Sequence, residues 1–160
     1  MIASIRRILF PTDFSEPAKK AQEYAMALAD RFGADLHLLN VIPPLTPPSD
    51  SPTPWVNSAD DIRWQVETAE LRLARELDSE WTKDHTAKYC AVMGSEVHEI
   101  MRYANENEID LIVIGTHGRT GLSHMLIGSV AEKLVRVATC PVLTVHPKGH
   151  QFLIDEHGDW

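Results

Sequence analysis

Strand-like and helix-like segments alternate five times along this chain, and no hairpin signal separates any two strands. Short apolar runs predict the strands, and apolar residues at helical spacing predict the helices between them. Two strands that are joined through a helix lie parallel, and such crossovers are right-handed in nearly all proteins. Helices then cover both faces of the sheet. The sequence therefore predicts a single-domain α/β fold with an open, parallel, five-stranded sheet.

Each expected element can be placed by residue range. The strands are expected at residues 5–11, 34–42, 87–93, 110–114 and 141–145. The helices are expected at 15–33, 58–84 (as one long helix), from 95 onward, and 129–138. Phe32 and Val135 are expected on the buried faces of the first and last helices. Residues 43–57 are rich in proline and predict a surface loop, and residues 148–160 predict a polar tail beyond a domain of residues 1–147.

Length and charge limit the classes of protein to which the chain can belong. Its 160 residues suit one domain, and its net charge of −8 argues against a nucleic-acid partner. No apolar run approaches the roughly 20 residues of a membrane span, and the apolar piece after Arg7 is too short for a signal peptide. Cys90 and Cys140 provide no disulfide framework. We therefore expect a cytoplasmic protein with no membrane insertion.

The stretch from Asp110 to Val130 has the layout of a phosphate-binding loop. An apolar run stops at Gly115, a loop with further glycines follows, and Ser129 opens the last helix. Glycine lets the backbone approach an anion, and a helix N-terminus adds unpaired N–H groups and a partial positive charge. The spacing matches neither the Walker A motif nor the dinucleotide-binding fingerprint. An ordinary connection between a strand and a helix is the alternative.

Asp13 is a second candidate, because it lies on the loop that leaves the C-terminal end of the first expected strand. Ligands of open α/β sheets bind beyond the carboxyl ends of the strands. Asp13 therefore either contacts a ligand or acts as a turn residue that stabilises the start of the next helix.

The glycine spacing resembles that of a known family. Gly115-x2-Gly118-x9-Gly128-Ser129 matches the G-x2-G-x9-G-S/T signature of the ATP-binding branch of the universal stress protein family. Residues 8–15, 36–42 and 140–145 resemble the first strand with its acidic turn, the second strand and the closing strand of that family. The resemblance implies a Rossmann-like sheet of order 3-2-1-4-5, which periodicity alone does not give. In that order Asp13 and the glycine loop face one crevice.

The resemblance also implies a ligand and its contacts. The ligand is ATP or another adenine nucleotide, with Mg²⁺ or Mn²⁺ carried on the phosphates, since no carboxylate pair near the loop offers a metal site built by the protein. The residues that match the family's binding positions are Pro11, Thr12, Asp13, Val41, Gly115, Thr116, Gly118, Arg119, Gly128, Ser129 and Val130. Asp13 is expected at the ribose or the adenine edge, Val41 beside adenine, and the loop residues at the ribose and phosphates. Arg119 either pairs with phosphate or is a solvated loop arginine.

The implied function is a nucleotide-dependent regulatory protein of the stress response, with an unidentified protein client. No catalytic base with an orienting partner and no second-substrate motif is evident, so we expect at most a slow ATPase. His117 and His124 are interpreted as polar loop residues. The alternatives are an enzyme that hydrolyses ATP or transfers nucleotidyl groups on a similar fold, and a scaffold whose pocket is vestigial. The last strand, residues 141–145, is apolar and uncharged and would lie at a sheet edge, which predicts a homodimer through that strand.

Overall fold

The computed structural model describes residues 4–44, 58–116 and 128–146. In chain order the elements are β1 (Arg7–Pro11), α1 (Glu16–Phe32), β2 (Asp35–Ile42), α2 (Ala59–Leu73), α3 (Trp81–Asp84), β3 (Ala87–Met93), α4 (Glu96–Glu106), β4 (Leu111–Gly115), α5 (Ser129–Val137) and β5 (Val142–Val145). None of the helices in these ranges is long and apolar enough to cross a membrane. The proline-rich segment from residue 45 to 57 and the tail from 147 onward lie outside the described residues.

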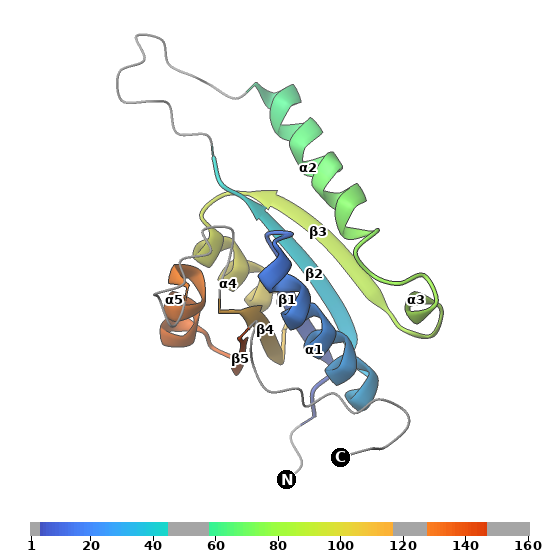
Figure 1. The fold of residues 1–160 in the computed structure, drawn as a ribbon. Coiled ribbons are helices and arrows are strands. Elements are labelled where there is room, and N and C mark those ends of the chain that lie inside the picture. The colour runs from blue at the N-terminus through green and yellow to red at the C-terminus, as the bar shows by residue number, and fades with distance from the viewer. Residues whose placement is uncertain (1–3, 45–57, 117–127, 147–160) are drawn as a thin grey trace.

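All five strands are parallel, and their order in the sheet is β3-β2-β1-β4-β5 (Figure 1). The central strand is β1, whose Ile8 lies opposite Leu36 of β2 on one side and Leu111 of β4 on the other. The predicted fold class and strand order are confirmed. The chain moves outward from β1 to β3 and then returns to β4, so the strand order reverses between β1 and β4. A crevice at such a reversal is where open α/β sheets bind ligands.

Two apolar cores lie on the two faces of the sheet. One joins the alanine-rich face of α1 and Leu73 of α2 to strand residues such as Phe10. The other joins α4 and α5, through residues such as Ile100 and Leu134, to Leu9 and its neighbours. Leu9 and Phe10 adjoin in sequence and enter opposite cores, because successive side chains of a strand point to opposite faces. The strands therefore have apolar residues on both faces.

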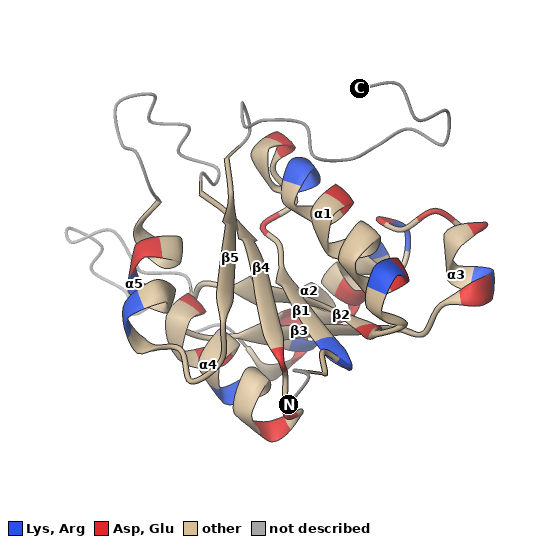
Figure 2. Cartoon of the chain, turned by 90° about the horizontal axis from the view of Figure 1, so that it is seen from below, with Lys and Arg blue, Asp and Glu red and all other residues tan. Residues whose placement is uncertain are grey.

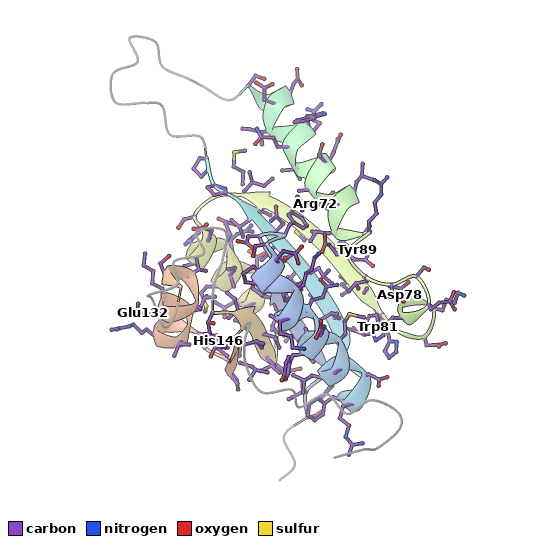
Figure 3. The ribbon with its side chains drawn as sticks, in the orientation of Figure 1. Arg72, Asp78, Trp81, Tyr89, Glu132 and His146 are labelled. Carbon is purple, nitrogen blue, oxygen red and sulfur yellow. The ribbon has the colours of Figure 1, made fainter. Side chains whose placement is uncertain are left out.

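The prediction of one helix over residues 58–84 is wrong. Helix α2 ends at Leu73, and the backbone then tightens: the N–H groups of Arg75 and Glu76 bond carbonyls only three residues back, at 3.0 and 3.1 Å. The Asp78 side chain accepts the N–H of Glu80 at 2.9 Å, a local bond that competes with helix continuation. Asp78 and Trp81 lie in the connection between α2 and β3 (Figure 3).

The apolar spacing that suggested the long helix still predicts correctly which side chains are buried. Leu77 lies in the turn after α2 and is only 6% exposed, and Trp81 of α3 packs against the same core. A stretch of turns can therefore bury the same side chains as a helix would, and periodicity alone does not separate the two.

Two expected core positions are exposed. Phe32 is 47% exposed at the end of α1, because the buried face of that helix is formed by small alanines that bring it close to the sheet. Val135 is 55% exposed, because α5 covers the sheet with Ala131 and Leu134. Both predictions of burial are wrong.

Candidate functional site

Buried hydrogen bonds fix the turn that follows β1. The Thr12 N–H donates to the Leu39 carbonyl at 2.9 Å, and the Asn40 side-chain amide donates to the Thr12 carbonyl at 2.7 Å. The Thr12 hydroxyl accepts the N–H of Phe14 at 3.1 Å, and Thr12 itself is only 7% exposed. Both Thr12 and Asn40 are buried polar residues with their bonds satisfied, so β2 holds the end of β1 in one position.

Asp13 stabilises the start of α1, as one of its two predicted roles requires. Its Oδ1 accepts the N–H of Ser15 at 3.0 Å, while Ser15, at the N-cap position, makes no capping bond through its own side chain. Phe14 between them has a φ of +62°, in the left-handed region that residues other than glycine rarely adopt. Residues in sparsely populated backbone regions cluster at functional sites.

On the other side of β1, hydrogen bonds join the end of β4 to the start of α5. The Thr116 N–H donates to the Val145 carbonyl at 2.9 Å, and the Gly128 N–H donates to the Thr116 carbonyl. The first helical bond of α5 runs from the Glu132 N–H to the Gly128 carbonyl at 2.9 Å. The N–H groups of Ser129, Val130 and Ala131 precede it, so they have no acceptor within the helix. The start of α5 therefore carries donors and a partial positive charge.

A cavity of about 330 Å³ lies between these two structures, within the range of small-molecule sites. Of the predicted site residues, it is lined by Pro11, Thr12, Asp13, Val41, Gly115, Gly128, Ser129 and Val130. Thr116 is buried and connects β4, β5 and α5, but it does not line the cavity. Gly118 and Arg119 lie outside the described residues, as do His117 and His124. That these residues bind a nucleotide stays a prediction.

Sequence reasoning missed part of the cavity wall. The additional lining residues are Ala18, Leu39, Pro43, Glu96, Ile100, Ile114 and Ala131. Most of them are apolar residues of the expected strands and helices, and nothing in one sequence separates a core face from a pocket face. Glu96 had a usable signal, because it begins the helix that follows β3 and therefore lies near the carboxyl edge of the sheet.

The described part of the cavity wall contains two carboxylates, Asp13 and Glu96, and no lysine or arginine. Charged residues gather on the helices and near strand ends, whereas the strands carry few (Figure 2). An anion bound by this part of the wall would therefore depend on backbone N–H groups, which are best placed at the start of α5. Among the described residues, no group of three or more His, Cys, Asp or Glu could hold a metal ion.

His37 is buried in β2 but does not line the cavity. Its Nδ1 lies 3.0 Å from the Tyr103 hydroxyl of α4, and burial lowers its pKa to about 4, with a contribution from Lys88. The imidazole is therefore neutral at pH 7 and belongs to the packing between sheet and helix.

Comparison with known proteins adds independent information. The sequence profile described as the universal stress protein family matches residues 4–146. Universal stress protein MJ0531 of Methanocaldococcus jannaschii is 33% identical over 144 residues, covering 88% of this chain and 81% of its own. The solved structure of the universal stress protein UspA from Lactobacillus plantarum is 26% identical and superposes with a TM-score of 0.70, covering 90% of this chain and 99% of its own.

Two more distant solved structures contain adenine nucleotides. A universal stress protein in complex with cAMP is 20% identical, with a TM-score of 0.64 over 91% of this chain and 99% of its own. A family protein from Arabidopsis thaliana with AMP bound is 19% identical, with a TM-score of 0.57 over 88% of this chain and 91% of its own. At these identities the likeness shows the shared fold.

Proposed function

The chain belongs to the universal stress protein family, and from this membership we propose that it binds ATP, or another adenine nucleotide, as a regulatory protein of the stress response. Nucleotide occupancy would change a surface that an as yet unidentified client protein recognises. Two solved relatives hold cAMP and AMP, which supports an adenine nucleotide as the ligand class.

The observation that carries the proposal is one cavity in which an open helix start lies beside Asp13. The N–H groups at Ser129 and Val130 supply donors for phosphate oxygens, and Gly128 leaves the approach free of a side chain. A carboxylate has about four acceptor sites, so Asp13 can accept a hydrogen bond from a ribose hydroxyl or a base amine in addition to the Ser15 N–H. Gly118 and Arg119 of the predicted loop would complete the phosphate contacts.

We propose little or slow hydrolysis. The sequence has no base with an orienting partner and no second-substrate motif, and His37 is neutral and away from the cavity. Mg²⁺ or Mn²⁺ would be carried on the phosphates, since an all-protein site is not required for these ions. The alternative, an enzyme that hydrolyses ATP or transfers nucleotidyl groups, requires turnover near the ~10 s⁻¹ that is typical of enzymes.

We also propose a homodimer that pairs β5 with its symmetry copy. Strand β5 lies at the edge of the sheet, its Leu143 is 36% exposed, and Val135 and Val137 of α5 are more than half exposed. An uncharged, apolar edge with open backbone donors favours pairing, and a two-fold contact closes at two subunits. The alternative is that the tail after residue 147 covers this edge.

A cytoplasmic location fits the two free cysteines, Cys90 and Cys140.

Mass spectrometry of the purified, unheated protein tests the proposed ligand. An adenine nucleotide at near one per chain is expected, and a phosphate-release assay on the same sample should give turnover far below ~10 s⁻¹. Another class of bound molecule would contradict the ligand assignment. Fast phosphate release that depends on Asp13 would favour the enzyme alternative.

A further inference from the structure

The cavity has two ends that the sheet topology separates. Glu96 opens α4 just after Gly94, whose N–H donates to the Ile42 carbonyl at 3.0 Å, so Glu96 belongs to the β2 end. Ser129 opens α5, which hydrogen bonds tie to the end of β4. Strands β2 and β4 flank β1 on opposite sides, which places their ends about 10 Å apart. That separation is comparable with the length of a nucleoside.

The two ends favour opposite chemistry. The α5 end offers backbone N–H donors and the positive end of a helix dipole, which suit phosphate. The β2 end offers the carboxylate of Glu96 beside the apolar Val41 and Pro43, which suits a flat apolar ring with a donor at its edge. A nucleotide with its phosphates at α5 therefore directs its base toward Glu96.

The Glu96 carboxylate is available for such a contact. Among the described residues, no hydrogen bond or ion pair engages its side chain, whereas Glu99 one turn later is paired with Arg102 at 2.7 Å. A glutamate in the first turn of a helix also has an ordinary role, because it interacts favourably with the helix dipole. That role does not depend on which base is bound, so the two roles predict different results.

We propose that Glu96 accepts a hydrogen bond from the 6-amino group of the purine and thereby selects adenine over hypoxanthine. This inference rests on the proposed nucleotide function and assigns the base specificity of the nucleotide site to the Glu96 side chain. Adenine presents an amino donor at position 6, whereas hypoxanthine presents a carbonyl acceptor. A carboxylate only accepts hydrogen bonds, so it attracts the first group and repels the second.

Calorimetric titration of nucleotide-free protein with MgATP and MgITP tests the proposal. The parent protein should bind ATP at least about tenfold more tightly than ITP, which corresponds to about 1.4 kcal/mol. In Glu96→Gln the amide can turn its N–H toward a carbonyl, so the ATP-to-ITP ratio should fall to within about threefold. Removal of a negative charge raises the affinity for both triphosphates, and the ratio cancels that effect.

Glu67→Gln is the matched control, because Glu67 is an exposed glutamate of α2 away from the cavity. It should leave the ratio unchanged. Equal binding of ATP and ITP by the parent, or an unchanged ratio in Glu96→Gln, would overturn the role of Glu96 while nucleotide binding stands. Titration with MgdATP tests whether Glu96 contacts the ribose instead: if Glu96→Gln changes the ATP-to-dATP ratio and leaves the ATP-to-ITP ratio unchanged, the proposal is overturned. Binding of neither triphosphate by the parent protein would refute the proposed function and with it this inference.

Discussion

The guanidinium carbon of Arg72 in α2 lies 4.0 Å from the ring centroid of Phe14, which follows the cavity-lining residue Asp13 in the chain. Phe14 has the strained φ of +62°, and its ring also packs against the core on the α1 side of the sheet. The contact over the ring face is a cation–π interaction. It connects the C-terminal end of α2 (Figure 3) to the turn that positions Asp13.

Removal of the Arg72 side chain should therefore affect both stability and ligand binding. We expect Arg72→Ala to lower the free energy of unfolding by about 0.5–2 kcal/mol and to weaken ATP binding several-fold, because the turn at Asp13 loses its support. Urea unfolding and calorimetry would measure the two effects. Arg75→Ala, an exposed arginine of the following turn, is the control and should change neither. Unchanged affinity in Arg72→Ala would show that the turn is held without it.

The start of α5 should be intolerant of a side chain at Gly128. Gly128→Val should abolish nucleotide binding by filling the approach to the helix start, and the φ of −68° lets valine adopt the native backbone. Ser129→Ala should lower the affinity for nucleotide only slightly, because the backbone N–H of residue 129 remains. A folded Gly128→Val protein that binds ATP like the parent would show that the phosphates lie elsewhere.

Asp13 should contribute to nucleotide binding through its carboxylate and to stability through its hydrogen bond to the Ser15 N–H. Asp13→Asn keeps an oxygen that can accept the Ser15 N–H, so stability should change little. Asp13→Ala should weaken nucleotide binding by about 1–3 kcal/mol and also lower stability, because both hydrogen bonds are lost. Comparison of the two variants by calorimetry and thermal unfolding separates the contact to ligand from the support of the turn. Equal ligand affinity in the parent protein and in Asp13→Ala would show that Asp13 makes no significant contact with the ligand.

His37 should make the fold less stable in mild acid. Its pKa is about 6.5 in the unfolded chain and about 4 in the folded one, so the unfolded state binds the extra proton between these values. The free energy of unfolding should fall by up to about 3 kcal/mol as the pH drops from about 7 to 4. Below pH 4 the contribution of His37 should no longer change with pH. His37→Gln should flatten that part of the urea-unfolding profile.

His85 provides a control of opposite sign. A backbone bond to Trp81 and a bond to Asp30 raise its pKa, so it stabilises the fold at low pH and loses that contribution as pH rises. His85→Gln should therefore steepen the acid-side loss that His37→Gln flattens. Identical profiles for the two variants would contradict the assignment of the slope to His37.

The predicted dimer is best tested at Leu143. Val145 is only 6% exposed and packs in the core on the α1 side, so a charge there would damage the subunit itself. Leu143 is 36% exposed on the edge strand, and Leu143→Lys should shift the protein toward monomer by placing an unpaired charge in the interface. Light scattering after size exclusion should give twice 18.0 kDa for the parent and a lower mass for the variant. A monomeric parent protein, or a dimer that tolerates Leu143→Lys, would contradict pairing through β5.

The sequence predicted those features that local patterns encode. Apolar runs and helical spacing located the five strands, and the position of Asp13 after a strand predicted that it lies at the crevice. The break after Leu73 was missed, because Leu77 and Trp81 keep helical spacing although turns carry them. The strand order came from family resemblance, since pairing between distant strands leaves little trace in one sequence.

Glu96 was missed for a related reason. A glutamate in the first turn of a helix is common on any protein surface, and its place in the cavity wall depends on how α4 docks on the sheet. Likewise, the contact between Arg72 and Phe14 joins residues far apart in the chain. Such contacts between elements emerge only from the packed structure.

Thermal unfolding of nucleotide-free protein with increasing MgATP tests the central claim most directly. If ATP binds the cavity beside α5, free ligand at about 100 times its Kd should stabilise the fold by about 2.7 kcal/mol, and Gly128→Val should abolish that gain. A parent protein whose unfolding is unchanged at millimolar MgATP, or a Gly128→Val protein stabilised equally, would contradict nucleotide binding at this site.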